Sequence, residues 1–420
     1  EFDTATRQFV EGGFCLPEAK SSTTWIDADT LYVGTDFGPG SLTDSGYPRV
    51  IKRWKRGTPL ASADTVFEGE AQDVSASVWL DLTPGHERTI FSRSLDFYHQ
   101  QHALMNGDQK VAFDIPSDAS FSFWNHCADA IDTLLIELRS DWQVGASTYA
   151  SGSLLATDTA AYLAGERRFD ILFQPTATRS LAGFSTTRDH VIVNVLDNVA
   201  SRLDLWRRTA VGFEARPIDA PFPGTLSVRS LHDPMQADDP LAECYLLGYT
   251  DFLTPDSLFL GHTEPQPGRP ALEPLKARPA LFDAEGLRTE QRFATSADGT
   301  RVPYFIVWPR GAEANGRNPT LLYGYGGFEV ALNPWYSGGY GRAWFERGGA
   351  LVVANVRGGG EFGPAWHQAA ILENKQRSYD DFIAVAEDLI AQGVTSPRHL
   401  GIMGGSNGGL LVGAVFTQRP

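Results

Sequence analysis

The sequence is poor in cysteine, in basic charge and in long hydrophobic runs. Its three cysteines, Cys15, Cys127 and Cys244, lie far apart and match neither a metal-ligand spacing nor a disulfide framework, so we expect reduced thiols. Acidic residues outnumber basic residues by 51 to 35, and the formal net charge of −16 argues against nucleic acid and anionic membranes as partners. No apolar run approaches the roughly 18 residues that a membrane span needs. These absences favour a cytoplasmic protein without a metal or organic cofactor, although the chain begins with Glu1 and an upstream secretory signal stays open.

Helical periodicity is also scarce, up to about residue 281. Short runs of β-branched and aromatic residues are bounded there by Gly, Pro, Asp and Asn, which predicts many short strands in a sandwich, a barrel or a propeller. Acidic turns precede two of the apolar runs, at 31–33 and 191–193, and this recurrence favours a propeller. At roughly 40–50 residues per blade the region would hold about six blades, and other all-β folds stay open. The clearest predicted strands cover residues 30–34, 49–54, 133–138, 190–195 and 201–206.

A proline-rich segment then marks a change of pattern. Five prolines fall within residues 265–279, and such a segment can form neither a central strand nor the interior of a helix. A long loop between blades would account for it, but the residues after it favour a linker between domains. Past about residue 287 strands alternate with helices, so we place a β-propeller domain at residues 1–283 and an α/β domain at residues 284–420.

The pattern of the second domain is that of an α/β-hydrolase. An Asp-Gly turn joins two predicted strands, 291–295 and 302–308. Strands of the buried type are predicted at 320–323 and 350–355, with a helix at 338–347 between them. The strongest predicted helix, residues 378–392, has one apolar face formed by Phe382, Val385, Ala386, Leu389 and Ile390.

One stretch near the end of the chain carries the clearest chemical signal. Gly404-Gly405-Ser406-Asn407-Gly408 has the form G-x-S-x-G, with a short apolar strand before it and a helix-forming segment after it. Strand, tight turn and helix are the context of a nucleophile elbow, in which a strained backbone presents a serine hydroxyl. The glycines two residues before and two residues after Ser406 give such a turn the room it needs. The alternative is a Gly-rich turn whose serine only caps the following helix.

Four phrases stand in order along the second domain. They are residues 323–328 (Tyr-Gly-Tyr-Gly-Gly-Phe), residues 355–363 (Asn-Val-Arg-Gly-Gly-Gly-Glu-Phe-Gly), Trp366-His367 with Asn374-Lys375, and residues 404–409. Together they resemble the catalytic domain of the prolyl oligopeptidase family of serine peptidases. The resemblance implies a multidomain chain with an incomplete seven-bladed β-propeller followed by the N-terminal half of an α/β-hydrolase domain. It also implies a serine-type oligopeptidase or endopeptidase that hydrolyses short peptides, with cleavage after proline as a further implication.

The resemblance assigns roles to four residues. Ser406 is the expected nucleophile, and the backbone N–H of Asn407 and the hydroxyl of Tyr325 are the expected donors of an oxyanion hole. Phe328 is expected to line the substrate pocket beside the scissile bond, with an ordinary core aromatic as the alternative. Such donors make physical sense, because the loss of one costs about 3–4 kcal/mol in the transition state.

The residues that would activate the serine are missing from their expected places. A serine needs a histidine base that is oriented by an acid, and in this fold both follow the nucleophile along the chain. The fourteen residues after Ser406 contain neither Asp nor His, His399 lies at the far end of the preceding strand, and His367 is expected to make a local hydrogen bond. We therefore expect an internal fragment of a longer enzyme, inactive by itself, with the triad acid and histidine beyond Pro420.

Other functions stay open beside this one. A non-peptidase serine esterase would use the same elbow, and a propeller with a vestigial hydrolase half would be a binding module without catalysis. Dinucleotide binding is disfavoured, because Glu329 stands where the third glycine of a G-x-G-x-x-G fingerprint would be. Short peptides are the expected partners, and the sequence carries no signature of an oligomeric state.

Overall fold

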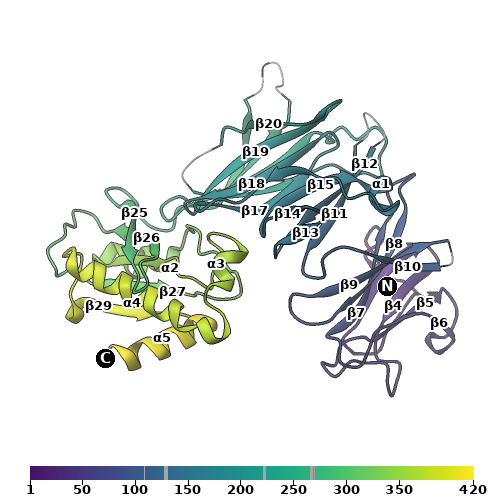
Figure 1. Cartoon of the computed structure of the whole chain (residues 1–420), viewed down its shortest axis with the longest axis horizontal. Coiled ribbons are helices and arrows are strands. Elements are labelled where there is room, and N and C mark those ends of the chain that lie inside the picture. Colours follow the sequence, from purple (N-terminus) through teal and green to yellow (C-terminus); the bar gives the residue numbers. More distant parts are fainter. Residues whose placement is uncertain (108, 127–130, 221–223, 265–267, 269) are drawn as a thin grey trace. The chain divides into compact units, whose positions relative to one another are not determined.

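The computed structural model describes residues 1–107, 109–126, 131–220, 224–264, 268 and 270–420 (Figure 1). The chain divides into two compact units, residues 1–121 with 159–166 and residues 122–158 with 167–420. Of the three cysteines, Cys127 lies outside the described residues, while Cys15 is exposed, Cys244 is buried, and both are free thiols. In the part of the chain that the structure describes, no helix combines the length and the apolar character needed to cross a bilayer.

The first unit consists mainly of two antiparallel sheets whose strands pair in chain order. Leu31, Val33 and Trp54 pack with Phe14 in the core of the first sheet, and Ile51, Ala76 and Phe91 join a second core. The strands are β1 (Phe2–Asp3) and β2 (Gln8–Phe9), which form a hairpin, β3 (Ser22–Asp27), β4 (Thr30–Gly34), β5 (Val50–Lys55) and β6 (Asp64–Glu68) in one sheet, and β7 (Ser75–Asp81), β8 (Arg88–Ser94), β9 (Gln100–Asn106) and β10 (Gln109–Phe113) in the other; α1 (Thr159–Leu163) and a 3₁₀ turn at Leu60–Ser62 complete the unit.

The second unit contains three further antiparallel sheets of four strands each, among the residues described. Their strands also pair in chain order, and the first of these sheets carries an inserted hairpin. The sheets are β11 (Ser120–His126), β12 (Ile131–Glu137), β15 (Leu154–Asp158) and β16 (Asp170–Phe173), with the hairpin β13 (Trp142–Val144) and β14 (Ser147–Tyr149); β17 (Arg179–Thr186), β18 (His190–Asp197), β19 (Ala200–Thr209) and β20 (Gly212–Pro217); and β21 (Thr225–Ser230), β22 (Cys244–Thr250), β23 (Ser257–His262) and β24 (Leu272–Ala277).

The described residues thus hold five successive four-stranded meanders, which are typical of propeller blades. All five strands predicted from the sequence are present, as β4, β5, β12, β18 and β19. The two acidic turns both lead into the second strand of a sheet, β4 and β18, so their recurrence reflects a structural repeat. Five sheets occur rather than about six, because residues 1–20 form only a short hairpin and the third sheet carries insertions.

The prediction that the whole proline-rich segment is a linker is wrong. Residues 272–277 form β24, which pairs with β23 at the edge of its sheet. Pro274 lies opposite Phe259, at a point where the register of the two strands shifts. An edge strand leaves one side of its backbone without a ladder partner, so proline is tolerated there although it has no N–H to donate.

The mixed five-stranded sheet of the second unit has the order β25-β26-β28-β27-β29. The first two strands form the predicted antiparallel hairpin, and β28, β27 and β29 run parallel to one another. Figure 1 shows this sheet with its helices in green and yellow. The elements are β25 (Arg288–Thr295), β26 (Arg301–Trp308), β27 (Thr320–Gly324), α2 (Gly338–Ala343), β28 (Ala350–Ala354), α3 (Pro364–Gln368), α4 (Gln376–Ala391), β29 (Leu400–Met403) and α5 (Asn407–Gln418), with 3₁₀ turns at Phe345–Arg347, Leu372–Asn374 and Pro397–His399.

Alternation along the strands explains why both faces of this sheet are covered. Tyr304 and Ile306 of β26 pack with Phe382 of α4 in one core, together with Leu411 of α5. The intervening residue Phe305 points into a second core on the opposite face. This period of two, with helices on the first face, matches the predicted α/β pattern.

Candidate active site

Two chain segments that carry candidate residues leave the sheet side by side. β27 and β29 are parallel neighbours, with Tyr323 opposite Met403 at their ends. Tyr325 follows the end of one strand and Ser406 follows the end of the other. Because the carboxyl ends of neighbouring parallel strands meet at one edge, the sheet brings these two segments together there, as in other open α/β sheets.

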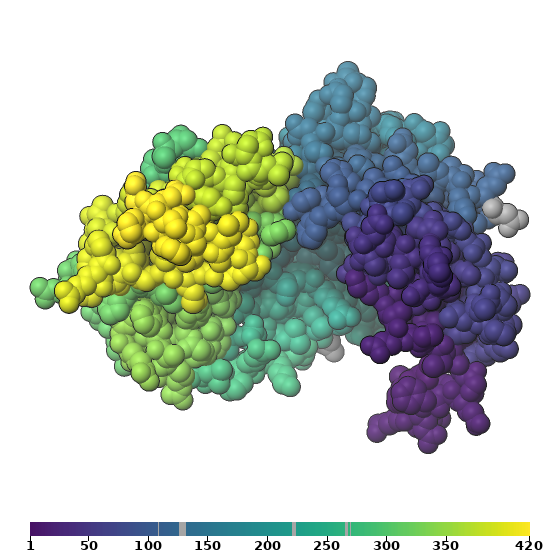
Figure 2. All heavy atoms as spheres, turned by 90° about the horizontal axis from the view of Figure 1, so that it is seen from below, coloured from purple at the N-terminus to yellow at the C-terminus, as the bar shows by residue number. Residues whose placement is uncertain are grey.

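Ser406 has a strained backbone in the tight turn between β29 and α5. Its φ of 54° and ψ of −120° differ from those of the extended residue that usually caps a helix, and its side chain makes no capping hydrogen bond to α5. The residue is exposed, and the C-terminal part of the chain, yellow in Figure 2, lies on the surface in that view. The alternative in which Ser406 only caps the helix is therefore wrong.

The glycines on either side of Ser406 are required by close backbone contacts. A Cβ atom at Gly404 would lie 2.4 Å from the carbonyl oxygen of Gly408, and a Cβ at Gly408 would lie 2.6 Å from that of Gly324. Both distances are far shorter than a carbon atom tolerates. The G-x-S-x-G spacing therefore lets the elbow fold tightly on itself and against the end of β27.

The side chain of Asn407 joins the elbow to the segment that carries Tyr325. Its Nδ2 donates a hydrogen bond of 2.6 Å to the carbonyl oxygen of Tyr325. A Cβ at Gly327 would lie 2.4 Å from the same nitrogen, so this contact also needs a glycine. Asn407 is the first residue of α5, where backbone N–H groups have no intrahelical partner and the helix dipole favours negative charge.

Phe328 lies in the loop that follows β27, and 51% of its surface is exposed. The alternative of an ordinary core aromatic is therefore wrong. Phe328 and Glu329 both have left-handed backbones, with φ of 52° and 58°. The Glu329 carboxylate forms an ion pair with Arg139, and burial raises the pKa of this carboxyl group. The next helix after β27 is α2, which begins only at Gly338, whereas a dinucleotide fingerprint opens directly into a helix.

A buried charged network beside the loop was not predicted. Arg357 is 4% exposed and contacts Asp381, which is fully buried, through Nε at 2.9 Å and Nη2 at 2.6 Å. It also bonds the more exposed Asp298, and the pKa of Asp298 is held below its usual value by this guanidinium. The signal in the sequence was an arginine directly after a buried strand and before three glycines, to which no role was given.

The two histidines of this region both make local contacts. Nδ1 of His367 lies 2.7 Å from the carbonyl oxygen of Gly358 and 3.1 Å from the backbone nitrogen of Glu329, so either tautomer makes one local hydrogen bond, as predicted. Burial lowers the pKa of His367. Nδ1 of His399 lies 2.9 Å from Ser396 Oγ, at the end of β29 opposite to the elbow. Among the described residues, no group of three or more His, Cys, Asp or Glu side chains could hold a metal ion.

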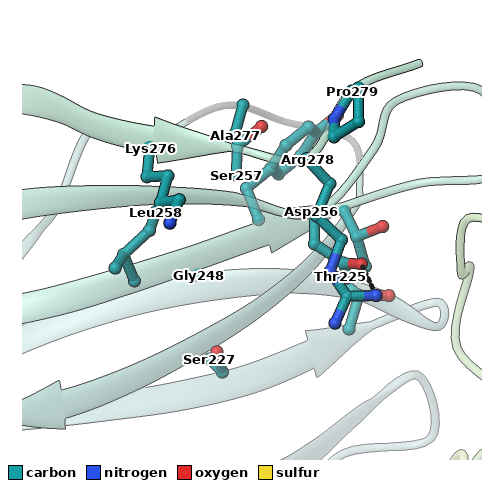
Figure 3. Close-up of a pocket in the computed structure, with 12 residues that line it drawn as sticks. Thr225, Ser227, Gly248, Asp256, Ser257, Leu258, Lys276, Ala277, Arg278 and Pro279 are labelled. Carbon is teal, nitrogen blue, oxygen red and sulfur yellow. Dashed lines mark ion pairs between the residues drawn. The ribbon is translucent and has the colours of Figure 1, made fainter.

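A cavity of about 600 Å³ lies elsewhere, on the sheet β21–β24 (Figure 3). Its lining includes Ser227, Leu258 and Lys276, and an ion pair of 3.3 Å joins Asp256 to Arg278 at its edge. None of the four candidate residues lines it. We therefore place the candidate site at the edge of the mixed sheet, where Ser406 has its strained backbone and Asn407 bonds to the Tyr325 carbonyl.

Comparison with known proteins relates this edge to a family of peptidases. Residues 322–420 match the model of the prolyl oligopeptidase family. The chain is 42% identical over 429 residues to an uncharacterized peptidase of Sinorhizobium fredii and covers 57% of that protein. A prolyl endopeptidase of Elizabethkingia meningoseptica is 40% identical over 178 residues, which are 41% of this chain and 24% of that protein.

The solved structures give the same relationship. The structure of a post-proline cleaving enzyme from Rickettsia typhi superposes with a TM-score of 0.86 and 32% sequence identity. The alignment covers 100% of this chain and 61% of the other. The chain thus spans less than two thirds of the length of these relatives.

Proposed function

We propose that the chain is part of a serine oligopeptidase of the prolyl oligopeptidase family, whose model residues 322–420 match, and that Ser406 is its nucleophile. One observation carries the proposal: Ser406 is exposed between β29 and α5 with a φ of 54°. A left-handed backbone at a residue other than glycine costs on the order of 1–3 kcal/mol, and such strain is concentrated at functional sites.

The proposed chemistry proceeds through an acyl-enzyme. The Ser406 oxygen attacks the carbonyl carbon of a peptide bond, the carbon–nitrogen bond breaks, and the serine proton passes through a base to the leaving amine. Water then hydrolyses the ester and restores the serine hydroxyl. The reaction needs a histidine base and an acid to orient it, and we assign neither role to a residue of this chain.

Three further residues belong to the proposed site. The backbone N–H of Asn407 and the hydroxyl of Tyr325 would stabilise the negative charge that develops on the carbonyl oxygen. The hydrogen bond between Asn407 Nδ2 and the Tyr325 carbonyl supports this pairing, because it holds the two segments together. Phe328 would line the pocket beside the scissile bond, which agrees with its exposure.

Short peptides are the proposed substrates, with cleavage after proline as the finer proposal. The match to a prolyl endopeptidase and to a post-proline cleaving enzyme supports that preference. We also propose that residues 1–283 belong to a seven-bladed propeller, of which the five described meanders are blades, and that residues 284–420 are part of the hydrolase domain.

Labelling of the nucleophile tests the proposal. A fluorophosphonate probe should modify the full-length protein at Ser406, and Ser406→Ala should abolish both labelling and turnover. Gly405 has open space around its Cβ position, so Gly405→Ala is a matched control at the neighbouring residue. Absence of labelling in the wild-type protein would exclude Ser406 as the nucleophile.

The competing function is a serine esterase on the same fold. Turnover of a proline-containing peptide amide should be compared with that of the corresponding ester and of the same peptide with alanine in place of proline. A peptidase cleaves the amide, and the Ser406→Ala substitution abolishes this cleavage. Cleavage of the ester alone would favour the esterase.

A further inference from the structure

The loop formed by residues 325–332 needs an external support. It carries Tyr325 and Phe328, and two of its consecutive residues, Phe328 and Glu329, have left-handed backbones. Each such residue is destabilised by about 1–2 kcal/mol relative to a right-handed conformation. A strained loop of this kind persists only where surrounding contacts impose it.

The three glycines at residues 358–360 lie directly against the backbone of this loop. A Cβ atom at Gly358 would be 2.4 Å from the carbonyl oxygen of Gly326, and one at Gly360 would be 2.1 Å from that of Glu329. A Cβ at Gly359 would be 2.9 Å from the carbonyl oxygen of Val330. Each glycine of the run therefore meets a different carbonyl of the loop, at a distance that excludes any side chain.

Polar side chains hold both ends of the same loop. Glu361 Oε1 accepts a hydrogen bond of 3.0 Å from the backbone N–H of Leu332, and Asn355 Nδ2 donates one of 2.9 Å to the Leu332 carbonyl oxygen. Asn355 Nδ2 also lies 3.2 Å from Glu361 Oε1. At the other end, Lys375 Nζ donates a hydrogen bond of 2.5 Å to the carbonyl oxygen of Gly326.

Burial of Glu361 and Asn355 makes their hydrogen bonds to the loop costly to break. Glu361 is 1% exposed and Asn355 is fully buried, so neither side chain can exchange its protein partner for water. An unsatisfied buried polar group costs about 1–3 kcal/mol, which favours the loop conformation in which Glu361 Oε1 and Asn355 Nδ2 both have partners.

We propose that residues 358–361 are the support that fixes the loop 325–332 in its active form, and that Glu361 is a positioning residue for the proposed reaction. It acts through the Leu332 backbone on the placement of Phe328 and Tyr325. The effect of Glu361 on peptide cleavage rests on the proposed function. Its effect on the conformation of the loop 325–332 does not depend on catalysis.

The structural test uses hydrogen exchange of the backbone amides in residues 325–332 of the 420-residue chain. Glu361→Ala and Gly360→Ala should each accelerate this exchange at least tenfold. Gly401→Ala is the matched control, because its Cβ would have only ordinary contacts, the nearest at 3.6 Å. Exchange in both variants equal to wild type would overturn the proposal even if the protein proved to be no peptidase.

The kinetic test uses the full-length protein and a proline-containing peptide amide. Glu361→Ala should lower kcat/KM at least tenfold, with KM rising because the pocket at Phe328 is displaced. Glu361→Gln keeps an acceptor for the Leu332 N–H and should restore kcat/KM to within about threefold of wild type, a rescue expected from the hydrogen bond. A glutamine variant that folds but is as impaired as the alanine variant would contradict the role of this acceptor. If wild type itself neither cleaves peptides nor reacts with the probe, the proposed function fails and the exchange result alone decides the inference.

Discussion

The Nδ2 atom of Asn407 lies 2.6 Å from the carbonyl oxygen of Tyr325. Asn407 begins α5, directly after the elbow, and Tyr325 follows the end of β27. One hydrogen bond therefore connects the two residues that are proposed to supply the oxyanion donors. The relative position of Asn407 and Tyr325 is therefore fixed by the Asn407 side chain as well as by the sheet.

Loss of this bond should weaken catalysis without removing a donor. Asn407→Ala keeps the backbone N–H but frees the Tyr325 segment, and a neutral hydrogen bond contributes about 0.5–1.5 kcal/mol. We expect kcat to fall about tenfold in the full-length protein, which corresponds to about 1.4 kcal/mol in the barrier. Steady-state kinetics measure the change, and Asn315→Ala, in an exposed loop, is the control. An unchanged kcat would show that the sheet alone fixes the two segments.

Removal of the proposed hydroxyl donor should have a larger effect. Tyr325→Phe keeps the ring and the carbonyl that accepts from Asn407, so the loop stays anchored. Loss of one donor of an oxyanion hole reduces kcat by about 10²–10³. We expect that reduction with KM nearly unchanged, because the donor acts on charge that develops in the transition state. A variant with wild-type kcat would remove Tyr325 from the proposed site.

Stability should depend strongly on Arg357. Arg357→Leu leaves the fully buried Asp381 without its cationic partner, and removal of one member of a buried ion pair costs about 3–5 kcal/mol. Urea unfolding of the chain should show a loss in this range. Arg342→Leu is the control, because Arg342 pairs with Glu346 at 3.5 Å on the surface and such pairs contribute about 0–1 kcal/mol. Equal losses of unfolding free energy in the two variants would mean that the buried ion pair contributes no more than the exposed one.

Local patterns in the sequence predicted the parts of the fold that local physics determines. The Asp-Gly turn and the apolar run after it located β26, and the spacing of Phe382, Val385 and Leu389 located the buried face of α4. The G-x-S-x-G spacing located the tight turn between β29 and α5. The strained backbone of Ser406 could be expected because glycines two residues before and two residues after it leave room for a tight turn.

Contacts between distant segments could not be predicted in the same way. The bond between Leu332 and Glu361 joins residues 29 positions apart, and no periodicity encodes it. The left-handed backbones of Phe328 and Glu329 carry no signal either, since neither residue type favours that conformation. Pro274 illustrates a related limit: proline excludes a central strand, but whether it lies in a linker or in an edge strand depends on what pairs beside it.

The buried carboxyl group of Glu361 should make stability depend on pH. Desolvation raises its pKa from 4.5 to about 7 in the folded chain, and the hydrogen bonds from Leu332 and Asn355 only partly oppose this. The folded state therefore keeps the proton over a range in which the unfolded state has lost it. Since the folded state binds more protons between these two values, stability falls as the pH rises through that window and levels off above it.

The size of the effect is set by the shift in pKa. A difference of about 2.5 pKa units corresponds to about 3 kcal/mol of unfolding free energy. Glu361→Gln cannot titrate, so the stability of wild type minus that of the variant should decline by about this amount between about pH 4.5 and about pH 8. Urea unfolding at several pH values measures both proteins, and groups common to the two cancel in the difference. If this difference stayed constant over the range, the pKa of Glu361 would be ordinary. Its side chain would then accept the Leu332 N–H in the ionised form.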